Sequence, residues 1–225
     1  VHLDLTGFAD DFMSARFPRI LDKCRSLGIN VPSERVPVVP AAHYLCGGVV
    51  TDSVGATNLD RLYAIGDVAM TGLHGANRLG GNSLTDLLTF GKRAGEYAAK
   101  AAAAIVGWLE IDQSEIDSVV AETLAPLNRE GGENPAKVVE DLREMMQEKA
   151  GIIRTGALLE EALADLDGLE ARGERTSPGG GRIYNPGWHQ ALEVSAMADI
   201  SRMCALSALA REESRGAHTR DDFPV

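Results

Sequence analysis

The sequence has few cysteines, few aromatic residues and no long apolar run. Its three cysteines, Cys24, Cys46 and Cys204, are widely separated and in no CxxC spacing. That pattern argues against a disulfide framework or a metal site and favours a reducing, cytoplasmic compartment. The longest apolar run, 101–109, is about half of the roughly 20 residues that a transmembrane helix needs. We therefore expect no direct membrane span, and membrane contact only through a partner subunit on the inner face.

Positive charge is also scarce. The chain has 22 Lys and Arg residues against 33 Asp and Glu residues, a formal net charge of -11. Nucleic-acid binding needs a concentration of basic side chains, and the basic pair Lys92 and Arg93 forms no patch. We therefore expect no nucleic-acid partner. The chain also opens without an initiator methionine or a basic-then-apolar leader, and we expect it to be a fragment.

The sequence does contain a glycine-rich first half and a helical second half. Short apolar runs at 48–50 and 62–65 predict strands joined by tight turns. A long helix is predicted from Asn82 and Ser83, which would cap it, to about Ala102. Further helices are predicted at 10–27, 113–127, 135–172 with breaks at Gly151 and Gly156, and 188–213. The expected fold class is α/β plus all-α.

Three motifs in the first half carry chemistry. The first is YAIGD at 63–67, preceded by Thr57. It places the carboxylate of Asp67 at the end of a predicted strand, where open α/β sheets bind ligands. The structural alternative is an Asx turn.

The second motif is the glycine-rich run 72–84, which leads directly into the long helix. Glycines let a planar ligand approach the backbone, and a helix start offers unpaired N–H groups and a positive dipole end. Donors at Ser83 and Leu84 would stabilise the anionic N1 and C2 carbonyl of a reduced flavin. Arg78 could pair bidentately with a carboxylate, and a structural surface arginine is the alternative.

The third motif is HYLCGG at 43–48. A histidine between a proline-stiffened strand and a Gly-Gly turn can present its ring to a pocket. The alternative for His43 is a structural histidine.

Together, in this order and at these separations, the motifs resemble the flavoprotein subunits of succinate dehydrogenase and fumarate reductase, and their relative L-aspartate oxidase. The tail segments 151–155, 184–188 and 213–224 are similar to the C-terminal helical domain of that family. The resemblance covers nearly the whole chain. It implies that residues 1–35 end a capping domain, residues 36–110 form the C-terminal half of a Rossmann-like FAD-binding domain, and residues 111–225 form a helical bundle domain.

The resemblance also implies roles for individual residues. His43 and Arg78 match residues that hold a substrate carboxylate while hydride passes between a substrate carbon and flavin N5. Asp67 matches the contact to the ribityl chain of FAD, and Asn82, Ser83 and Leu84 match residues beside the flavin ring. His74 is expected to shape its loop, and His218 and Arg220 are expected to dock the helical domain. The implied cofactor is FAD and the implied substrate is a C4-dicarboxylate.

Parts of the family pattern are missing from the sequence. No Gly-x-Gly-x-x-Gly is present, so the ADP-binding half of the FAD site is absent, as is the proton-shuttling arginine of the capping domain. We expect the chain alone to be inactive and to bind FAD weakly or not at all. The motifs favour succinate and fumarate chemistry with an iron–sulfur partner subunit. L-aspartate oxidase remains the alternative.

Two other classes remain to be weighed. A non-catalytic helical adaptor would use the glycine-rich part only as a scaffold, and would not need His43 and Arg78 to converge. A nicotinamide-linked disulfide reductase shares the Gly-Asp motif, but needs a redox cysteine pair that this sequence lacks.

Overall fold

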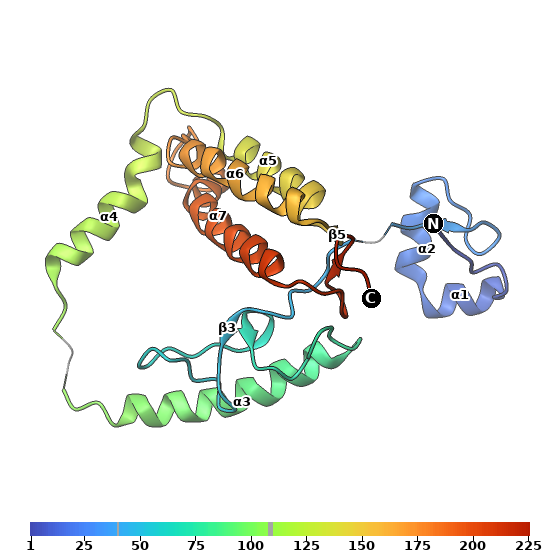
Figure 1. Ribbon diagram of the computed structural model, residues 1–225, viewed down its shortest axis with the longest axis horizontal. Helices are drawn as coiled ribbons and strands as arrows, with labels where there is room; N and C mark the ends of the chain where they lie inside the picture. Colours follow the sequence, from blue (N-terminus) through green and yellow to red (C-terminus); the bar gives the residue numbers. More distant parts are fainter. Residues whose placement is uncertain (40, 108–109) are drawn as a thin grey trace. The chain divides into compact units, whose positions relative to one another are not determined.

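The computed structural model describes residues 1–39, 41–107 and 110–225 (Figure 1). The chain divides into two compact units, Val1–Ala41 and Ala42–Val225. The last two residues of the apolar run 101–109 lie outside the described residues. No helix among the described residues is both long and apolar enough to cross a membrane.

The first unit is a small helical pair with a two-stranded sheet. Strand β1 (His2–Leu3) pairs antiparallel with β2 (Val36–Pro37), and helices α1 (Asp10–Arg16) and α2 (Pro18–Ser26) lie between them in sequence. The single helix predicted at 10–27 is wrong. The chain breaks at Phe17, where φ is -133° and ψ is 47°, because Pro18 favours the first position of a new helix.

A small core holds this unit together. It is formed by buried side chains from both helices and from the segment that follows them: Met13, Leu21, Cys24 and Val31.

The glycine-rich part of the second unit contains a short parallel strand pair. Strand β3 (Val49–Val50) pairs with β4 (Ala69–Met70), which follows the 3-10 turn η1 (Gly66–Val68). The strand predicted at 62–65 is not formed. That segment folds back as a tight hairpin instead, in which the Ala64 N–H donates to the Gly55 carbonyl at 2.9 Å.

Helix α3 (Asn82–Ala103) follows the glycine-rich loop. Its N-cap is Gly81, in the left-handed region at φ 86°, and no side chain caps the helix. The predicted caps are therefore wrong: Asn82 is the first helical residue, and the Ser83 hydroxyl donates to Asp67 instead. Gly91 lets the helix lie against Ile65, whose Cδ1 would be 3.3 Å from a Cβ at that position.

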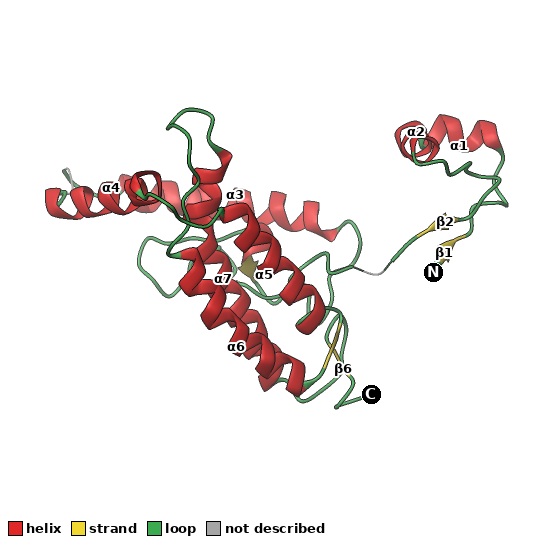
Figure 2. Ribbon diagram, turned by 90° about the horizontal axis from the view of Figure 1, so that it is seen from above, coloured by secondary structure: helices red, strands yellow, loops and turns green. Residues whose placement is uncertain are grey.

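The second half is helical, as predicted. It contains α4 (Gln113–Asn128), α5 (Pro135–Lys149), α6 (Gly156–Gly173) and α7 (Pro186–Ala210), with a parallel pair of β5 (Ile153–Arg154) and β6 (Thr219–Arg220). Each of these helices has an N-cap residue whose side chain accepts a hydrogen bond from a backbone N–H of the first turn. The four N-cap residues are Asp112, Asn134, Thr155 and Asn185. Helices α5, α6 and α7 lie side by side in both views (Figures 1 and 2).

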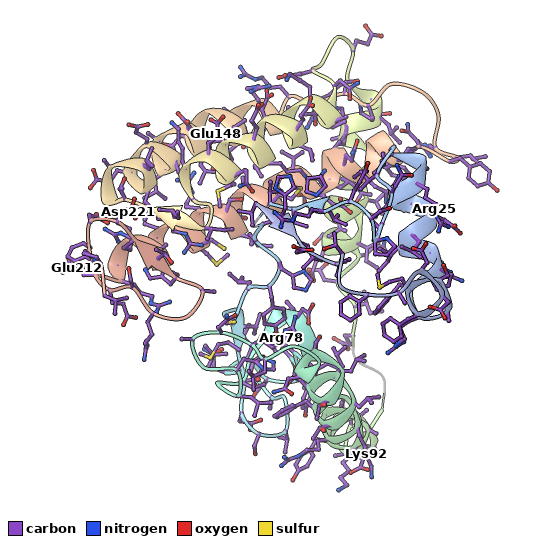
Figure 3. All side chains as sticks on the ribbon, turned by 90° about the vertical axis from the view of Figure 1, so that its right-hand side faces the viewer. Arg25, Arg78, Lys92, Glu148, Glu212 and Asp221 are labelled. Atoms are coloured by element: carbon purple, nitrogen blue, oxygen red, sulfur yellow. The ribbon has the colours of Figure 1, made fainter. Side chains whose placement is uncertain are left out.

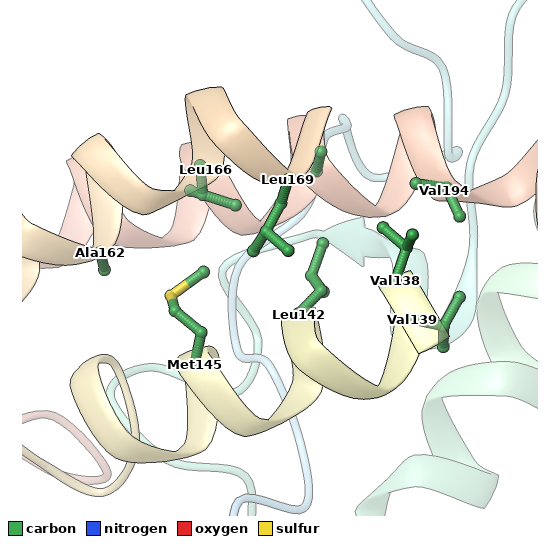
Figure 4. Packing of buried hydrophobic residues seen from close by; sticks show 9 residues of the cluster. Val138, Val139, Leu142, Met145, Ala162, Leu166, Leu169 and Val194 are labelled. Atoms are coloured by element: carbon green, nitrogen blue, oxygen red, sulfur yellow. The ribbon is translucent and has the colours of Figure 1, made fainter. Parts of the chain in front are cut away.

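The largest core lies between these three helices (Figure 4). Leu142 and Met145 of α5 face Leu166 and Leu169 of α6, and Val194 of α7 closes one end. Burying each such side chain stabilises the fold by about 1.5–3 kcal/mol. The bundle therefore has an apolar core of its own.

Candidate active site

His74 lies inside the glycine-rich loop. Its ring is edge-on to the Tyr44 ring, with centroids 5.6 Å apart and planes at 86°. The His74 Nε2 lies 3.8 Å from Asp86 Oδ2, and the two side chains are only 7% and 3% exposed. Neither ring nitrogen has a hydrogen-bond partner among the described residues. These contacts agree with the expected loop-shaping role.

Arg78 contacts the same tyrosine. Its guanidinium carbon is 4.3 Å from the centre of the Tyr44 ring, an attractive cation–π arrangement. Its Nη1 donates one long hydrogen bond, 3.4 Å, to the carbonyl of Leu79. Its Nε is buried without a partner, and no carboxylate of the described residues pairs with it. Figure 3 shows Arg78 near the start of α3, with Lys92 further along that helix.

Tyr44 is therefore the centre of the cluster. Its pKa is raised, first by burial and then by the negative charges of Asp67, Asp86 and Cys46, while Arg78 opposes the shift. The phenol accordingly stays neutral and offers its ring face to the guanidinium. The positive charge of Arg78 is held by an aromatic face rather than by a salt bridge.

The Gly-Asp turn lies against the start of α3. The Ser83 hydroxyl donates to Asp67 Oδ1 at 3.3 Å, which joins two motifs that are 16 residues apart. Gly66, at φ 69°, approaches Leu87 so closely that an added Cβ would lie 2.3 Å from its Cδ2. This close packing fixes the turn, and leaves the Asp67 carboxylate exposed.

The surface beside this turn is open and partly apolar. Gly80 and Gly81 have no atom within 4 Å of where a Cβ would stand. Asn82 is exposed, and Leu84 in the first turn of α3 is 68% exposed. Because the first N–H groups of a helix lack intrahelical partners, the start of α3 offers hydrogen-bond donors next to an apolar face.

His43 differs from the other expected site residues. Its side chain is exposed and makes no hydrogen bond or ion pair to the described residues. Its sequence neighbour Tyr44, rather than His43 itself, touches Arg78. The role of His43 in holding substrate stays a prediction.

The sequence alone does not identify two residues of the cluster, Tyr44 and Asp86. The sequence signal for Asp86 is its place as a lone acid among the apolar residues Leu84, Leu87 and Leu88 of α3. An acid in that setting is buried only with a polar neighbour, here His74.

The chain is similar to known proteins over its whole length. A family model described as "FAD binding domain" matches residues 1–84, and one described as "Fumarate reductase flavoprotein C-term" matches residues 139–225. The fumarate reductase flavoprotein subunit of Mycobacterium tuberculosis is 39% identical over 235 residues, which is 100% of this chain and 40% of that protein. The chain therefore resembles the flavoproteins of this family, of which it corresponds to the C-terminal part.

Other members of the flavoprotein family give the same picture. The L-aspartate oxidase of Yersinia pestis is 36% identical over 230 residues, which is 100% of this chain and 40% of that protein. The solved structure of Mycobacterium smegmatis Sdh1 in complex with UQ1 matches with a TM-score of 0.87 at 36% identity, over 100% of this chain and 38% of that one. The chain thus spans about 40% of the length of these relatives.

The fold class and the cofactor expected from the sequence are confirmed by these matches: α/β followed by a helical bundle, and FAD. The described residues fit FAD chemically. Asp67 offers an exposed acceptor for sugar-chain hydroxyls, and the start of α3 offers N–H donors beside the exposed side chain of Leu84. Gly80 and Gly81 leave the backbone open to a planar ring. The protein family is that of FAD-dependent oxidoreductases.

Proposed function

We propose that the protein containing this chain interconverts succinate and fumarate, with FAD as the hydride acceptor or donor at N5. The observation that carries the proposal is the state of Arg78. It is a guanidinium held over Tyr44 at the start of α3, with no carboxylate partner among the described residues. Leaving such a group partly buried and unpaired costs stability, so a carboxylate-bearing ligand is the natural partner.

Each remaining site residue has a role in this proposal. Arg78 binds a substrate carboxylate bidentately, and His43 holds the same carboxylate from the adjoining motif. Asp67 accepts hydrogen bonds from the ribityl chain. Asn82, Ser83 and Leu84 lie along the flavin ring, where donors at the start of α3 favour negative charge on the reduced ring.

The second candidate is L-aspartate oxidase chemistry, which makes iminoaspartate for NAD biosynthesis. It is supported by the 36% identity to the Yersinia pestis oxidase over the whole chain. Both activities need the same carboxylate grip, so Arg78 does not separate them. The non-catalytic adaptor has no comparable support, because an adaptor gives no reason for an unpaired guanidinium beside a flavin-type turn.

A partner subunit and a location follow from the preferred reading. Succinate oxidation delivers electrons that have to leave the flavin, and an iron–sulfur subunit would receive them. That subunit would bring the protein, as a peripheral component, to the inner face of the membrane from the cytoplasm.

The test uses the complete protein that contains this chain, purified with FAD and kept without oxygen. Succinate and L-aspartate are added separately while the flavin absorbance is followed. Bleaching by succinate alone supports the preferred reading, and bleaching by L-aspartate alone replaces it with the oxidase. Bleaching by neither ends both proposals.

Two variants sharpen this test. Arg78→Gln should slow bleaching by at least about 100-fold, because a charged contact to the substrate is lost. Arg93→Gln, at an exposed arginine on helix α3, should react as the unmodified protein does. Equal rates in both variants would remove Arg78 from the substrate site.

A further inference from the structure

The C-terminal segment touches the loop that carries Arg78. A tight turn spans 215–218: the Arg215 N–H donates to the His218 carbonyl at 2.8 Å, and the His218 N–H donates back at 3.2 Å. From the tip of this turn, the Ala217 N–H donates to the carbonyl of Ala76 at 3.2 Å. Ala76 lies two residues from Arg78 and two from His74.

The contact leaves no room for a side chain. Gly216 has φ 64°, and a Cβ there would stand 2.4 Å from the Ala76 carbonyl oxygen and 2.6 Å from the Ala76 Cβ. Most of the opposing atoms belong to the backbone, so a rotamer change would not relieve the clash. The loop and the turn are therefore fitted to each other at this point.

The turn is firmly attached to the helical bundle. Arg220 is 2% exposed and donates to the carbonyls of Ala208, Leu209 and Arg211 at the end of α7. It also pairs with Asp222, which accepts from the Gly156 N–H at the start of α6.

His218, only 4% exposed, supplies the second attachment. A guanidinium can only donate and a carbonyl can only accept. The neutral ring therefore accepts from Arg154 at Nδ1 (2.9 Å) and donates from Nε2 to the Arg211 carbonyl (3.3 Å). Both attachments lie within four residues of the contact with Ala76.

The geometry points to a brace: the turn 215–218 connects the helical bundle to the Arg78 loop and sets the position of the Arg78 guanidinium for substrate binding. Gly216 and Ala217 are positioning residues, since they touch the loop and not the substrate. The brace rests on the proposed function, in which Arg78 binds a carboxylate. It adds that the helical bundle controls substrate affinity.

The brace explains why so little else holds Arg78. Besides its contact with the Tyr44 ring, Arg78 makes a single hydrogen bond to the described residues, the 3.4 Å contact to the adjacent Leu79. The loop that carries Arg78 is fixed at His74, whose side chain is buried against Tyr44 and Asp86. A second fixed point at Ala76 leaves a single residue, Asn77, between the anchored backbone and Arg78.

The experiment compares Gly216→Ala with Gly179→Ala in the complete protein with FAD bound. Gly179 has a similar positive φ, 61°, but nothing lies within 4 Å of its added Cβ. Both variants therefore place an alanine at a positive φ, and only the first pushes on the loop. Binding of malonate, a dicarboxylate with no C–C bond to oxidise, is followed through the flavin spectrum.

Gly216→Ala should weaken malonate binding about 10-fold and raise the KM for succinate similarly, with the FAD content unchanged, because a carboxylate-binding arginine is displaced. Gly179→Ala should change neither. Equal affinity in the two variants would overturn the brace.

A double-mutant cycle separates the brace from the proposed function. In the Arg78→Gln background, Gly216→Ala should have no further effect on malonate binding. A full additional loss would show that Gly216 acts by another route. If Arg78→Gln alone leaves malonate binding unchanged, the proposed function fails, whatever Gly216 does.

A second variant at Gly216, with less backbone strain, separates displacement of the loop from loss of folding. Gly216→Asn tolerates the left-handed backbone better than Ala and keeps the clash. If both variants lose FAD while the helical bundle stays folded, the brace is wrong, because positioning Arg78 alone does not require FAD release.

Discussion

The guanidinium of Arg78 rests on the face of Tyr44, 4.3 Å from the ring centre. The His74 ring stands nearly perpendicular to the same ring, with the two centroids 5.6 Å apart. One aromatic side chain therefore supports both the cation of the site and the buried part of the loop.

Removing the ring should release Arg78. A cation–π contact contributes about 0.5–2 kcal/mol, so Tyr44→Leu should weaken malonate binding by roughly 2- to 30-fold. Tyr44→Phe retains the ring and should bind nearly as the unmodified protein does. Titration of the flavin spectrum measures both. Equal losses for Leu and Phe would show that the hydroxyl, not the ring, matters.

Removing His74 should destabilise the loop. His74→Leu leaves the Asp86 carboxylate 3% exposed without its polar neighbour, which should cost about 1–3 kcal/mol in the free energy of unfolding. Urea unfolding measures the loss. The double variant His74→Leu/Asp86→Leu should recover part of it, since no buried charge then remains. A double variant less stable than the single one would contradict this account.

The C-terminal segment should contribute less to the stability of the fold at low pH, because His218 then takes up a proton. Burial lowers the pKa of His218, and the guanidinium groups of Arg211, Arg154 and Arg220 lower it further, while the bond to the Arg211 carbonyl opposes them. The folded state thus binds its proton less readily than the unfolded state. Its contribution to stability is complete above the ordinary histidine pKa of about 6.5, and is lost as the pH falls below that value.

The matched variant for this effect is His218→Gln, which keeps a neutral donor and acceptor but cannot titrate. Thermal unfolding between about pH 7 and 5, the window around the ordinary histidine pKa, should show a smaller loss of stability for the variant than for the unmodified protein. Glu213 also has a lowered pKa, first because of its hydrogen bond from Arg211. It is present in both the variant and the unmodified protein. Parallel pH profiles would exclude His218 as the source.

Asp222 should stabilise the bundle by holding two helix ends. Its carboxylate accepts from Arg220 Nε and Nη2 and from the Gly156 N–H, each at 2.7 Å. Its pKa lies well below the usual range, chiefly because of the Arg220 hydrogen bonds. Asp222→Asn should therefore lower the free energy of unfolding, as measured by urea unfolding at neutral pH. The neighbouring Asp221→Asn, at an exposed carboxylate, should cost little.

The helices of the bundle could be predicted because their signals are local. Apolar spacing and a capping side chain such as Asn134 or Asn185 lie within a few residues of each helix start. The strand predicted at 62–65 is wrong because a strand needs a partner strand, and among the described residues Tyr63 pairs with Ala56 of its own hairpin. The break at Phe17 does have a local signal, because Pro18 favours the first position of a helix.

The candidate site was predictable where residue type reveals chemistry, as for Arg78 and the Gly-Asp turn at Asp67. The contact between Asp67 and Ser83 joins two separate motifs and needs the tertiary fold. The burial of Asp86 against His74 depends on loop packing, which periodicity along α3 does not encode. The turn at Gly216 meets Ala76 across 140 residues, so no local pattern announces it.

The attachment through Arg220 and Asp222 also decides where the bundle opens. Helix ends normally fray first, but the start of α6 and the end of α7 are tied to each other. The opposite ends of these helices are joined by the loop 174–185, where Ile183 and Tyr184 are 80% and 99% exposed. Exposed loop tips are the preferred sites of proteolytic nicking. Limited digestion with trypsin should therefore begin at Arg182, and the two halves should remain associated after the cut.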